Sequence, residues 1–408
     1  MARDIGQGLE TRMAKVGLRE WLAIAPVIAS GRLSRYGGSA GSPLNRFESD
    51  FSAAFGVQHT LVVSSGTGAL IAALAAAGIG PGDEVLVPAY TWIATAAAPL
   101  AVGAVPVLVE IDQSLTIDPA DILRKITPNT RAIIPVHMAN VVCDMDAIMQ
   151  IARDHNLLVI EDACQAVGLT YKGRKVGTIG DAGAYSFNQF KNINVGEGGA
   201  IVTNDDQLFA RARMYHDIGA VFRGHLDNAN APLIPGINLK ASQIQGAMLN
   251  VQLKKLTPML RRMRQRYEAM ADILTSRGGL RLIPQHDPTN AAGLHVVFDT
   301  EEEARDFATR NKRGVHRVYD SSRHVYTFWQ PILEQRTVHP KLNPYAWAAR
   351  PMDYSPKACP RSLDILKRTC RITVGENYPL VFMRYMARRM VKDWGMPLAP
   401  YTTNPGLT

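Results

Sequence analysis

Short apolar runs alternate with longer amphipathic segments through the first half of the chain. Runs of four to six residues, rich in Val, Ile and Leu, are bounded by turn residues and are typical of buried strands. Most of them are separated by segments with apolar residues at helical spacing. Strands that alternate with helices predict an α/β protein with a mainly parallel sheet covered on both faces. The expected strands are residues 60–63, 84–87, 105–110, 132–136, 157–160 and 200–203.

The second half of the chain shows one long pattern and several weak ones. Residues 243–276 carry a helical pattern with charges on one face, which predicts a helix bridging two domains. Residues 294–298 indicate a strand and 301–309 a helix, whereas 320–360 show no clear period. We therefore expect an N-terminal arm that wraps onto another part of the assembly, a large domain, and a bridging helix with a small C-terminal domain. Their predicted bounds are 1–35, 36–255 and 256–408.

The composition is 47% apolar and 20% charged over 408 residues, which is typical of a soluble globular protein. No apolar run is long enough to span a bilayer, and the N-terminus lacks the apolar core of a secretory signal. The four cysteines are scattered without CxxC spacing, which argues against a zinc site and a disulfide framework. We expect a cytoplasmic protein with no membrane partner and no bound metal.

The formal net charge of +9 raises the question of a nucleic-acid partner. Part of the charge lies in short clusters, at residues 254–255 and 261–264, on the long predicted helix. No interleaving of aromatic and basic residues and no helix-turn-helix signal accompanies these clusters. Solvated helix faces or attraction of an anionic substrate explain them better, so we expect no nucleic-acid partner.

Two residues of opposite charge frame the stretch 161–199. Asp162 closes the apolar run 157–160, and Lys191 follows about thirty residues later, between Ser186 and the glycine-rich turn 196–199. Each has an ordinary alternative, since an aspartate can cap a helix and most lysines are exposed. Together they suit a pyridoxal phosphate site. There a lysine forms a Schiff base with the cofactor, and a buried carboxylate holds the pyridine nitrogen protonated.

Other candidates follow predicted strands. The loop 64–68 opens a helix with small residues whose backbone N–H groups suit a phosphate, although such turns also serve packing. Trp92 follows a strand end, where ligands gather in open α/β sheets, but a core position is the alternative. His137 follows the strand 132–136 and is either structural or part of the site lining. The turn-rich loop 35–42 contains Tyr36, which we include with His137 as a substrate-side candidate.

Taken in order, these motifs resemble the DegT/DnrJ/EryC1/StrS sugar aminotransferase family, within the fold-type I pyridoxal phosphate enzymes. The resemblance covers about residues 30–260, and the pattern of motifs is specific although each motif alone is weak. The motifs are residues 64–70 (SSGTGAL), 82–85 (GDEV), 161–166 (EDACQA), 186–187 (SF) with Lys191, 196–200 (GEGGA) and 236–238 (GIN).

The resemblance implies a large domain with a mainly parallel seven-stranded sheet, a smaller C-terminal α+β domain, and bound pyridoxal 5′-phosphate. It implies that Lys191 forms the Schiff base and that Asp162 pairs with the pyridine nitrogen. It also implies a homodimer with shared active sites, because Asn238 would reach the phosphate of the partner subunit. The remaining implied contacts are Gln165 to the cofactor's 3′-oxygen, Trp92 to its ring, and Ser65, Gly66, Thr67 and Ser186 to its phosphate.

The predicted activity is transfer of an amino group from glutamate or glutamine to a keto-sugar, keto-cyclitol or related cyclic ketone. Some members of the family carry histidine in place of the lysine and dehydrate sugars, so Lys191 favours transamination. The stretch 135–138 resembles a subset that includes 3-amino-5-hydroxybenzoate synthase and the 8-amino-octulosonate transaminases. The alternatives are a dehydratase, lyase or aromatising enzyme of the same fold, and a non-catalytic regulatory protein.

Overall fold

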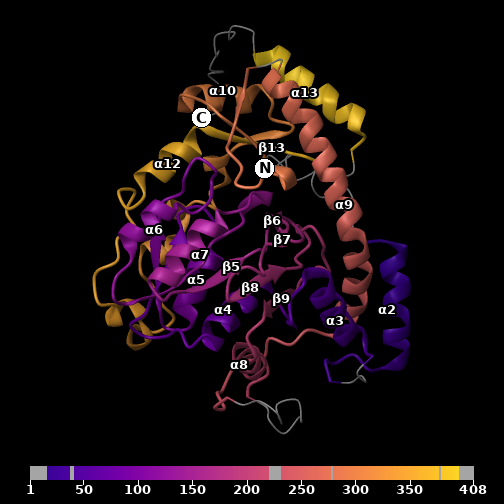
Figure 1. The fold of residues 1–408 in the computed structure, drawn as a ribbon, viewed down its shortest axis with the longest axis vertical. Coiled ribbons are helices and arrows are strands. Elements are labelled where there is room, and N and C mark those ends of the chain that lie inside the picture. The colour runs from indigo at the N-terminus through magenta and orange to yellow at the C-terminus, as the bar shows by residue number, and fades with distance from the viewer. Residues whose placement is uncertain (1–15, 37–40, 220–230, 277–278, 376–377, 395–408) are drawn as a thin grey trace, which may run out of the picture.

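The computed structural model describes residues 16–36, 41–219, 231–276, 279–375 and 378–394 (Figure 1). A large α/β domain forms the lower part of the view, and a smaller domain lies above it. Helix α9 (Gln243–Ser276) runs along one side of the molecule from the large domain to the small one. A helix is therefore present at the residues where the sequence predicts one, 243–276.

The large domain is built on a seven-stranded sheet in the order β1-β9-β8-β5-β4-β2-β3. The five strands β8, β5, β4, β2 and β3 run parallel to one another. Strand β9 is antiparallel to both of its neighbours, β1 and β8. The predicted fold class is confirmed. The strands are β1 (His59–Val63), β2 (Glu84–Pro88), β3 (Val105–Val109), β4 (Thr130–Ile133), β5 (Leu158–Asp162), β8 (Ala182–Ser186) and β9 (Gly199–Thr203).

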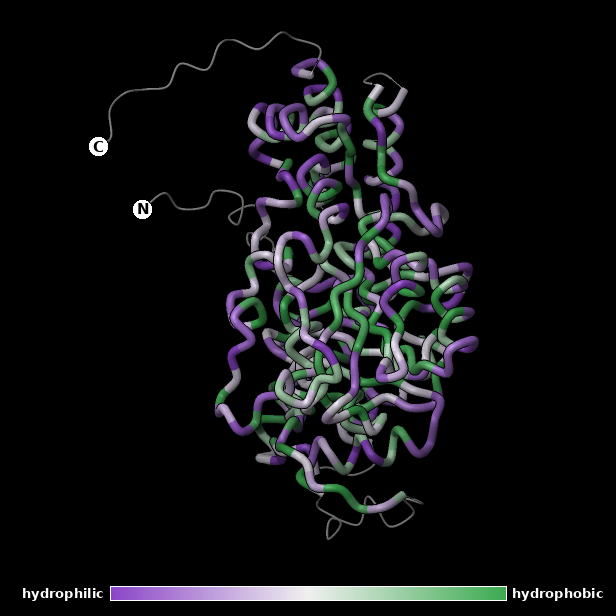
Figure 2. The backbone as a smooth tube through the Cα atoms, turned by 90° about the vertical axis from the view of Figure 1, so that its left-hand side faces the viewer, coloured by the Kyte–Doolittle hydropathy of each residue, from purple (hydrophilic) through white to green (hydrophobic). Residues whose placement is uncertain are grey.

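Side chains of the central strands alternate between two apolar layers. In β2, Leu86 belongs to one layer, and Val85 and Val87 belong to the other. Figure 2 shows the hydrophobic residues gathered along the strands in the interior. The first layer includes α3 (Pro43–Phe55), α6 (Pro119–Lys125), α7 (Met145–Asp154) and part of α9. The second includes α4 (Gly66–Ala76), α5 (Ala94–Ala101) and α8 (Asp206–His216).

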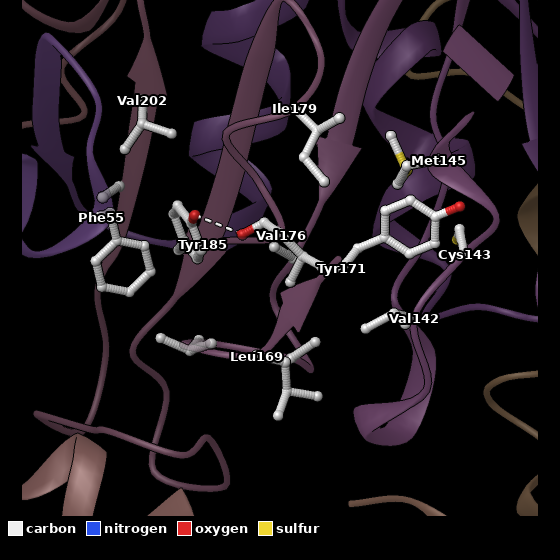
Figure 3. Close-up of a cluster of buried hydrophobic side chains, with 14 of the residues drawn as sticks. Phe55, Val142, Cys143, Met145, Leu169, Tyr171, Val176, Ile179, Tyr185 and Val202 are labelled. Atoms are coloured by element: carbon white, nitrogen blue, oxygen red, sulfur yellow. Dashed lines mark hydrogen bonds between the residues drawn. The ribbon is translucent and has the colours of Figure 1, made fainter. Parts of the chain in front are cut away.

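A short hairpin closes the first apolar layer near β8. It consists of β6 (Thr170–Tyr171) and β7 (Arg174–Lys175), which pair antiparallel. Figure 3 shows its neighbours Leu169 and Val176 among the side chains of Phe55 and Tyr185. The Tyr185 hydroxyl donates a hydrogen bond of 2.7 Å to the Val176 carbonyl, so the one polar atom of this ring is satisfied within the core.

The small domain contains a four-stranded antiparallel sheet in the order β10-β11-β13-β12. Helix α10 (Glu301–Arg310), helix α13 (Leu380–Trp394) and the end of α9 bury their apolar faces against one side of it. This arrangement agrees with the predicted α+β domain. The strands are β10 (Arg281–Leu282), β11 (Leu294–Val297), β12 (Val315–Arg317) and β13 (Thr369–Ile372).

Between β12 and β13 the chain returns to the large domain. Tyr326, Trp329 and Tyr354 are buried in the same apolar layer as α4 and α5. The Tyr354 hydroxyl donates to the Pro106 carbonyl at 2.7 Å. The predicted division placed all of 256–408 in the small domain, whereas this segment packs on the large one. Its elements are short: α11 (Gln330–Leu333), α12 (Pro360–Lys367) and several 3₁₀ turns, too brief to show a period.

The described part of the predicted arm forms helix α2 (Leu18–Ser30), and residues 1–15 lie outside the described residues. One face of α2 packs against α9 of the same chain, where buried Glu20 accepts a hydrogen bond from Gln252 and pairs with Lys255. The opposite face exposes Trp21 and other apolar side chains. The expected contact with another part of the assembly therefore stays a prediction, and only the exposed face of α2 is available for it.

Candidate active site

Asp162 ends strand β5 with its side chain almost fully buried. One carboxylate oxygen accepts a hydrogen bond of 2.8 Å from the Thr95 hydroxyl, and the other accepts one of 3.1 Å from the Cys164 backbone N–H. The backbone N–H of Asp162 donates to the Pro135 carbonyl at 2.9 Å. No helix follows Asp162 directly, so the alternative of a helix cap is wrong. The carboxylate is instead fixed at the carboxyl edge of the sheet.

Lys191 lies in the loop between β8 and β9. Its backbone N–H donates to the Asn188 carbonyl at 2.9 Å, and Phe187 and Gly198 close the base of the loop with a hydrogen bond of 2.8 Å. Strand β8 pairs parallel with β5, so this loop leaves the sheet at the edge where Asp162 lies. The Lys191 side chain is half-buried. Burial raises the pKa of the nearby Cys164 thiol well above its ordinary value, and the positive charge of Lys191 opposes this only in part.

The first turn of α4 lies against the same edge. Ser65 caps this helix, and its hydroxyl accepts a hydrogen bond of 2.9 Å from the Gly68 N–H. A Cβ atom on Gly66 would lie 2.8 Å from the Cβ of Ser186 and 2.9 Å from the sulfur of Cys164, so only glycine fits there. The exposed Thr67 follows. Unpaired N–H groups at a helix start, next to two hydroxyls, suit a phosphate.

Trp92 is 43% exposed just beyond β2, which excludes the alternative of a core position. Its ring centroid lies 5.6 Å from that of His324, and the ring centroid of Tyr90 lies 6.5 Å from that of His324. The Thr91 N–H donates to the His324 carbonyl at 2.9 Å, which ties the returning segment to the sheet edge. The indole therefore has an accessible face beside the site, as a stacking role requires.

His324 lies beside Trp92 in the site. The sequence did not indicate this residue, because its segment has no clear period and contains none of the family motifs. Burial, and then the positive charges of Arg323, Arg371 and Lys191, lower the pKa of His324 to about 3. Its imidazole is therefore neutral near pH 7 and can both donate and accept a hydrogen bond.

His137 does not take the predicted substrate-side position. The side chain is completely buried, its Nε2 lies 2.9 Å from a Glu161 oxygen, and its Nδ1 accepts from the Cys143 N–H at 3.1 Å. Because both ring nitrogens have hydrogen-bond partners within the protein, His137 has a structural role at the strand end. Glu161 also accepts hydrogen bonds from the N–H groups of Gly177 and Gly180, as its expected structural role requires.

Gln165 lies in the turn after Asp162 and is half-buried. Its backbone carbonyl accepts a hydrogen bond of 3.0 Å from the Asn140 N–H. The turn therefore keeps Gln165 close to the carboxylate, and a contact with the cofactor's 3′-oxygen stays a prediction.

Tyr36 and Asn238 lie near the carboxyl end of β1, where the Ser64 N–H at the start of the α4 turn donates to the Leu239 carbonyl at 2.7 Å. Asn238 is exposed and forms an isolated backbone bridge with Asp217, whose carboxylate pairs with Lys240. Burial raises the pKa of Tyr36 to about 12, with Arg35 and Asp217 as neighbours. Strand β5, with Asp162, is the third strand from β1 in the sheet. Within one subunit, Tyr36 and Asn238 are therefore set apart from the Asp162 side chain.

Two further properties of the described residues bear on the site. In that part of the chain no group of three or more His, Cys, Asp or Glu side chains is arranged to hold a metal ion. Across the same ranges no helix combines the length and apolar character needed to cross a membrane. The four cysteines are all free thiols.

The fold is that of the fold-type I aminotransferases. The chain matches the DegT/DnrJ/EryC1/StrS aminotransferase family over residues 23–346 and belongs to that family. The resemblance inferred from the motifs, and the aminotransferase class with it, are confirmed. The match also includes much of the aperiodic segment that the motifs did not assign.

Two curated relatives and one solved structure illustrate the similarity. The chain is 42% identical over 265 residues to GDP-perosamine synthase from Caulobacter vibrioides, covering 64% of this chain and 68% of the relative. It is 39% identical over 292 residues to L-glutamine:2-deoxy-scyllo-inosose aminotransferase from Streptoalloteichus tenebrarius, covering 68% of each. The crystal structure of 3-amino-5-hydroxybenzoic acid synthase superposes with a TM-score of 0.78 at 25% identity, covering 94% of this chain and 97% of the other.

Proposed function

We propose that this protein is a pyridoxal phosphate-dependent aminotransferase that moves an amino group from glutamate or glutamine to a keto-sugar or keto-cyclitol. The observation that carries the proposal is the placement of Asp162 and Lys191. Two hydrogen-bonded neighbours, β5 and β8, bring them to one edge of the sheet. The phosphate-suited turn of α4 lies beside the same edge.

The residues of this edge fit the cofactor. Asp162 would hold a proton on the pyridine nitrogen, and Trp92 would cover one face of the ring. Gln165 would contact the 3′-oxygen. Once bound, the cofactor supplies an electron-withdrawing ring that stabilises negative charge on the carbon next to the transferred nitrogen. The phosphate would be held by Ser65, Gly66, Thr67 and Ser186.

Lys191 would hold the cofactor and then move a proton with its Nζ. Its half-buried position, in the loop after the strand that pairs with β5, supports this role. The neutral imidazole of His324 adds a hydrogen-bonding group on the side of Trp92 without competing for that proton. The side chains of His324 and Trp92 would orient the substrate and leave little room for water.

The substrate class rests on the relatives. One is named for a GDP-linked amino sugar and another for a glutamine-dependent reaction on a cyclitol ketone. The shared chemistry is amination of a ring ketone, with an amino acid as donor. The positive net charge of the chain, +9, suits an anionic ligand such as a nucleotide-linked sugar.

We propose a homodimer in which Asn238 and Tyr36 complete the site of the partner subunit. The exposure of Asn238, which lies beside the end of β1 and not beside β5, supports this assignment. Exposed apolar side chains near it, Ile218, Leu233 and Ile237, are suited to an interface. We also propose a cytoplasmic location, supported by four free thiols.

A half-reaction tests this function directly. The purified protein, loaded with pyridoxal phosphate, is mixed with glutamate, glutamine or alanine, and the absorbance change that marks conversion of the cofactor to its amine form is followed. We expect the change with glutamine or glutamate, and its loss in Lys191→Ala. The amine form is then offered free and nucleotide-linked keto-sugars and keto-cyclitols. Absence of any donor-dependent change would contradict transamination, and ketone-dependent loss of water would indicate a dehydratase.

A further inference from the structure

The loop that carries Lys191 is tied to its surroundings by the side chain of the next residue. Asn192 donates from Nδ2 to the Val167 carbonyl at 3.0 Å and to Oδ1 of Asn140 at 3.1 Å. Val167 lies in the turn after β5, and Asn140 follows β4. Strands β8, β5 and β4 are neighbours in the sheet. The two hydrogen bonds therefore join the loop after β8 to the ends of two neighbouring strands.

These contacts determine how both amide groups are oriented. The carbonyl oxygen of Val167 can only accept a hydrogen bond, so the Asn192 atom that faces it must be the amide nitrogen. The second hydrogen of this nitrogen points to Asn140, which must present its oxygen. Asn140 thus acts as an acceptor for the loop, and a change at this position can remove the acceptor alone.

Asn140 lies in a turn with an uncommon backbone conformation. Ala139 and Asn140 are consecutive residues in the left-handed region, with φ of 52° and 62°. Asparagine adopts this region more readily than most other residues with a side chain. The Asn140 N–H donates to the Gln165 carbonyl at 3.0 Å, and the Val141 N–H donates to the Met138 carbonyl at 2.9 Å. The turn is therefore held by its own backbone, and the Asn140 oxygen has a fixed position.

The small domain limits the movement of the same turn from a second direction. A Cβ atom on Gly293, the residue before β11, would lie 2.4 Å from the Ala139 carbonyl oxygen, so only glycine permits this close approach. The turn thus lies between the start of a small-domain strand and the Gln165 carbonyl of the large domain. Both neighbours restrict the acceptor that Asn192 meets.

The later part of the loop is held separately by helix α9. The side-chain oxygen of Gln252 accepts from the Asn194 N–H at 3.2 Å, and Gln245 donates to the Glu197 carbonyl at 2.8 Å. These contacts position the return of the chain to β9. They lie beyond Lys191 in the chain, so the contact with Asn140 is better placed to orient the lysine.

We propose that Asn140 is a positioning residue that orients Lys191 through Asn192. This inference rests on the proposed function, in which Lys191 moves a proton with its Nζ. A group with that task must stay within hydrogen-bond reach of the reacting atom, and a misplacement of about 1 Å can lower a rate by about 100-fold. Asn140 acts by limiting the motion of the loop and not by contact with the substrate.

The first test compares Asn140→Gly with wild type. Glycine adopts the left-handed backbone without strain, so the variant should keep the turn and lose only the acceptor. At saturating glutamine we expect the rate of the donor half-reaction to fall by about tenfold, because one hydrogen bond is lost. The half-saturating glutamine concentration should stay unchanged, since the donor is not contacted.

Hydrogen exchange measures the same anchor without any reaction. In the purified full-length protein, the amides of residues 187–198 should exchange about tenfold faster in Asn140→Gly than in wild type. Asn156→Gly is the matched control, because Asn156 is also left-handed, with φ of 53°, but lies exposed after α7. It should change neither the rate nor the exchange of this loop.

Two aspartate variants separate the hydrogen bond from charge. Asn140→Asp keeps an acceptor for Asn192, whereas Asn192→Asp sets an oxygen against Oδ1 of Asn140 and the Val167 carbonyl. Each variant adds one negative charge to the same pair. Asn140→Asp should therefore stay close to wild type, and Asn192→Asp should lose about tenfold in rate. The circular dichroism of the bound cofactor should change in Asn192→Asp alone.

Three results would overturn the inference. They are a wild-type rate in Asn140→Gly, equal rates in the two aspartate variants, and faster exchange of the loop without a slower half-reaction. If Asn140→Gly does not fold, the aspartate variants test the same contact. If wild type shows no donor-dependent change at all, the proposed function fails. In that case unchanged exchange in Asn140→Gly would show that the anchor fails as well.

Discussion

The Thr95 hydroxyl donates a hydrogen bond of 2.8 Å to Oδ2 of Asp162, and it lies 2.7 Å from the hydroxyl of Thr91. Both threonines are completely buried. Thr91 lies between β2 and α5, and Thr95 lies in the first turn of α5, whereas Asp162 ends β5. A carboxylate proposed to face a cofactor is thus held by a strand-to-helix turn two strands away in the sheet. Its orientation depends on the packing of α5.

Thr95→Val keeps the shape of the side chain and removes this donor. A less well-fixed carboxylate should stabilise the protonated pyridine less, so the rate of the donor half-reaction should fall by about 10- to 100-fold. The rate is measured by rapid mixing with saturating glutamine. Thr309→Val, on an exposed face of α10, is the control because its hydroxyl bonds only within its own helix. A Thr95→Val enzyme with the wild-type rate would show that the carboxylate needs no such support.

His295 should make the fold sensitive to acid. Burial and then Arg371 lower its pKa to about 3 in the folded state, from an ordinary value of 6.5. The unfolded chain therefore binds more protons below pH 6.5, and stability falls as pH decreases through that range. Between pH 7 and 4.5 the free energy of unfolding should lose about 2–3 kcal/mol from this residue.

Urea unfolding of wild type and His295→Leu at these two pH values checks the assignment. The variant should lose less stability on acidification than wild type does. His155→Leu, at the exposed end of α7, should retain the wild-type dependence. If the His295 and His155 variants respond alike to acid, the buried imidazole is not the source.

Gly199→Ala should displace the phosphate-suited turn at the start of α4. A Cβ atom at this position would overlap the carbonyl of Ser65, which caps α4. We expect a loss of about 1–3 kcal/mol in stability from the overlap. The displaced N–H groups should also weaken pyridoxal phosphate binding by about tenfold. Equilibrium dialysis and thermal unfolding measure the two effects. Gly41→Ala, where a Cβ meets no atom within 4 Å, should change neither.

Subunit mixing tests whether Asn238 serves a neighbouring site. Lys191→Ala and Asn238→Trp should each be inactive as pure dimers. In a mixed dimer, one site combines an intact Lys191 from one chain with an intact Asn238 from the other. Random mixing should therefore restore about a quarter of the wild-type activity. A mixture that stays inactive, although subunit exchange is verified by mass, would place Asn238 in the site of its own chain.

The sequence predicts the strands that are rich in branched apolar residues, because burial on both faces leaves a continuous signal. It does not predict β8, whose residues Ala182–Ser186 are mostly small. The structure gives the reason: a side chain on Gly183 would collide with the backbone of Gly177. In such close packing, small residues replace the β-branched ones on which strand recognition depends.

The residues of the candidate site likewise include some that the sequence could predict and some that it could not. Asp162, Lys191 and the α4 turn belong to local motifs, so the sequence could name them. His324 reaches the site only because its segment returns from the small domain to the edge of the large sheet, and this segment has no clear period and no motif. His137 is the opposite case, because the sequence suggests a ligand-binding role that the structure does not support. It follows a strand end as a ligand-binding residue would, yet Glu161 holds its ring within the protein.

The return of residues 326–359 to the large domain has a consequence for how the protein can be divided. The chain passes from the large domain to the small one along α9, comes back before Tyr326, and leaves again through α12. Cutting it after residue 255 would remove Trp329 and Tyr354 from the large-domain core. The large domain is therefore not an autonomous folding unit. Both domains should melt in a single cooperative transition, and a fragment ending near residue 255 should be insoluble when expressed alone.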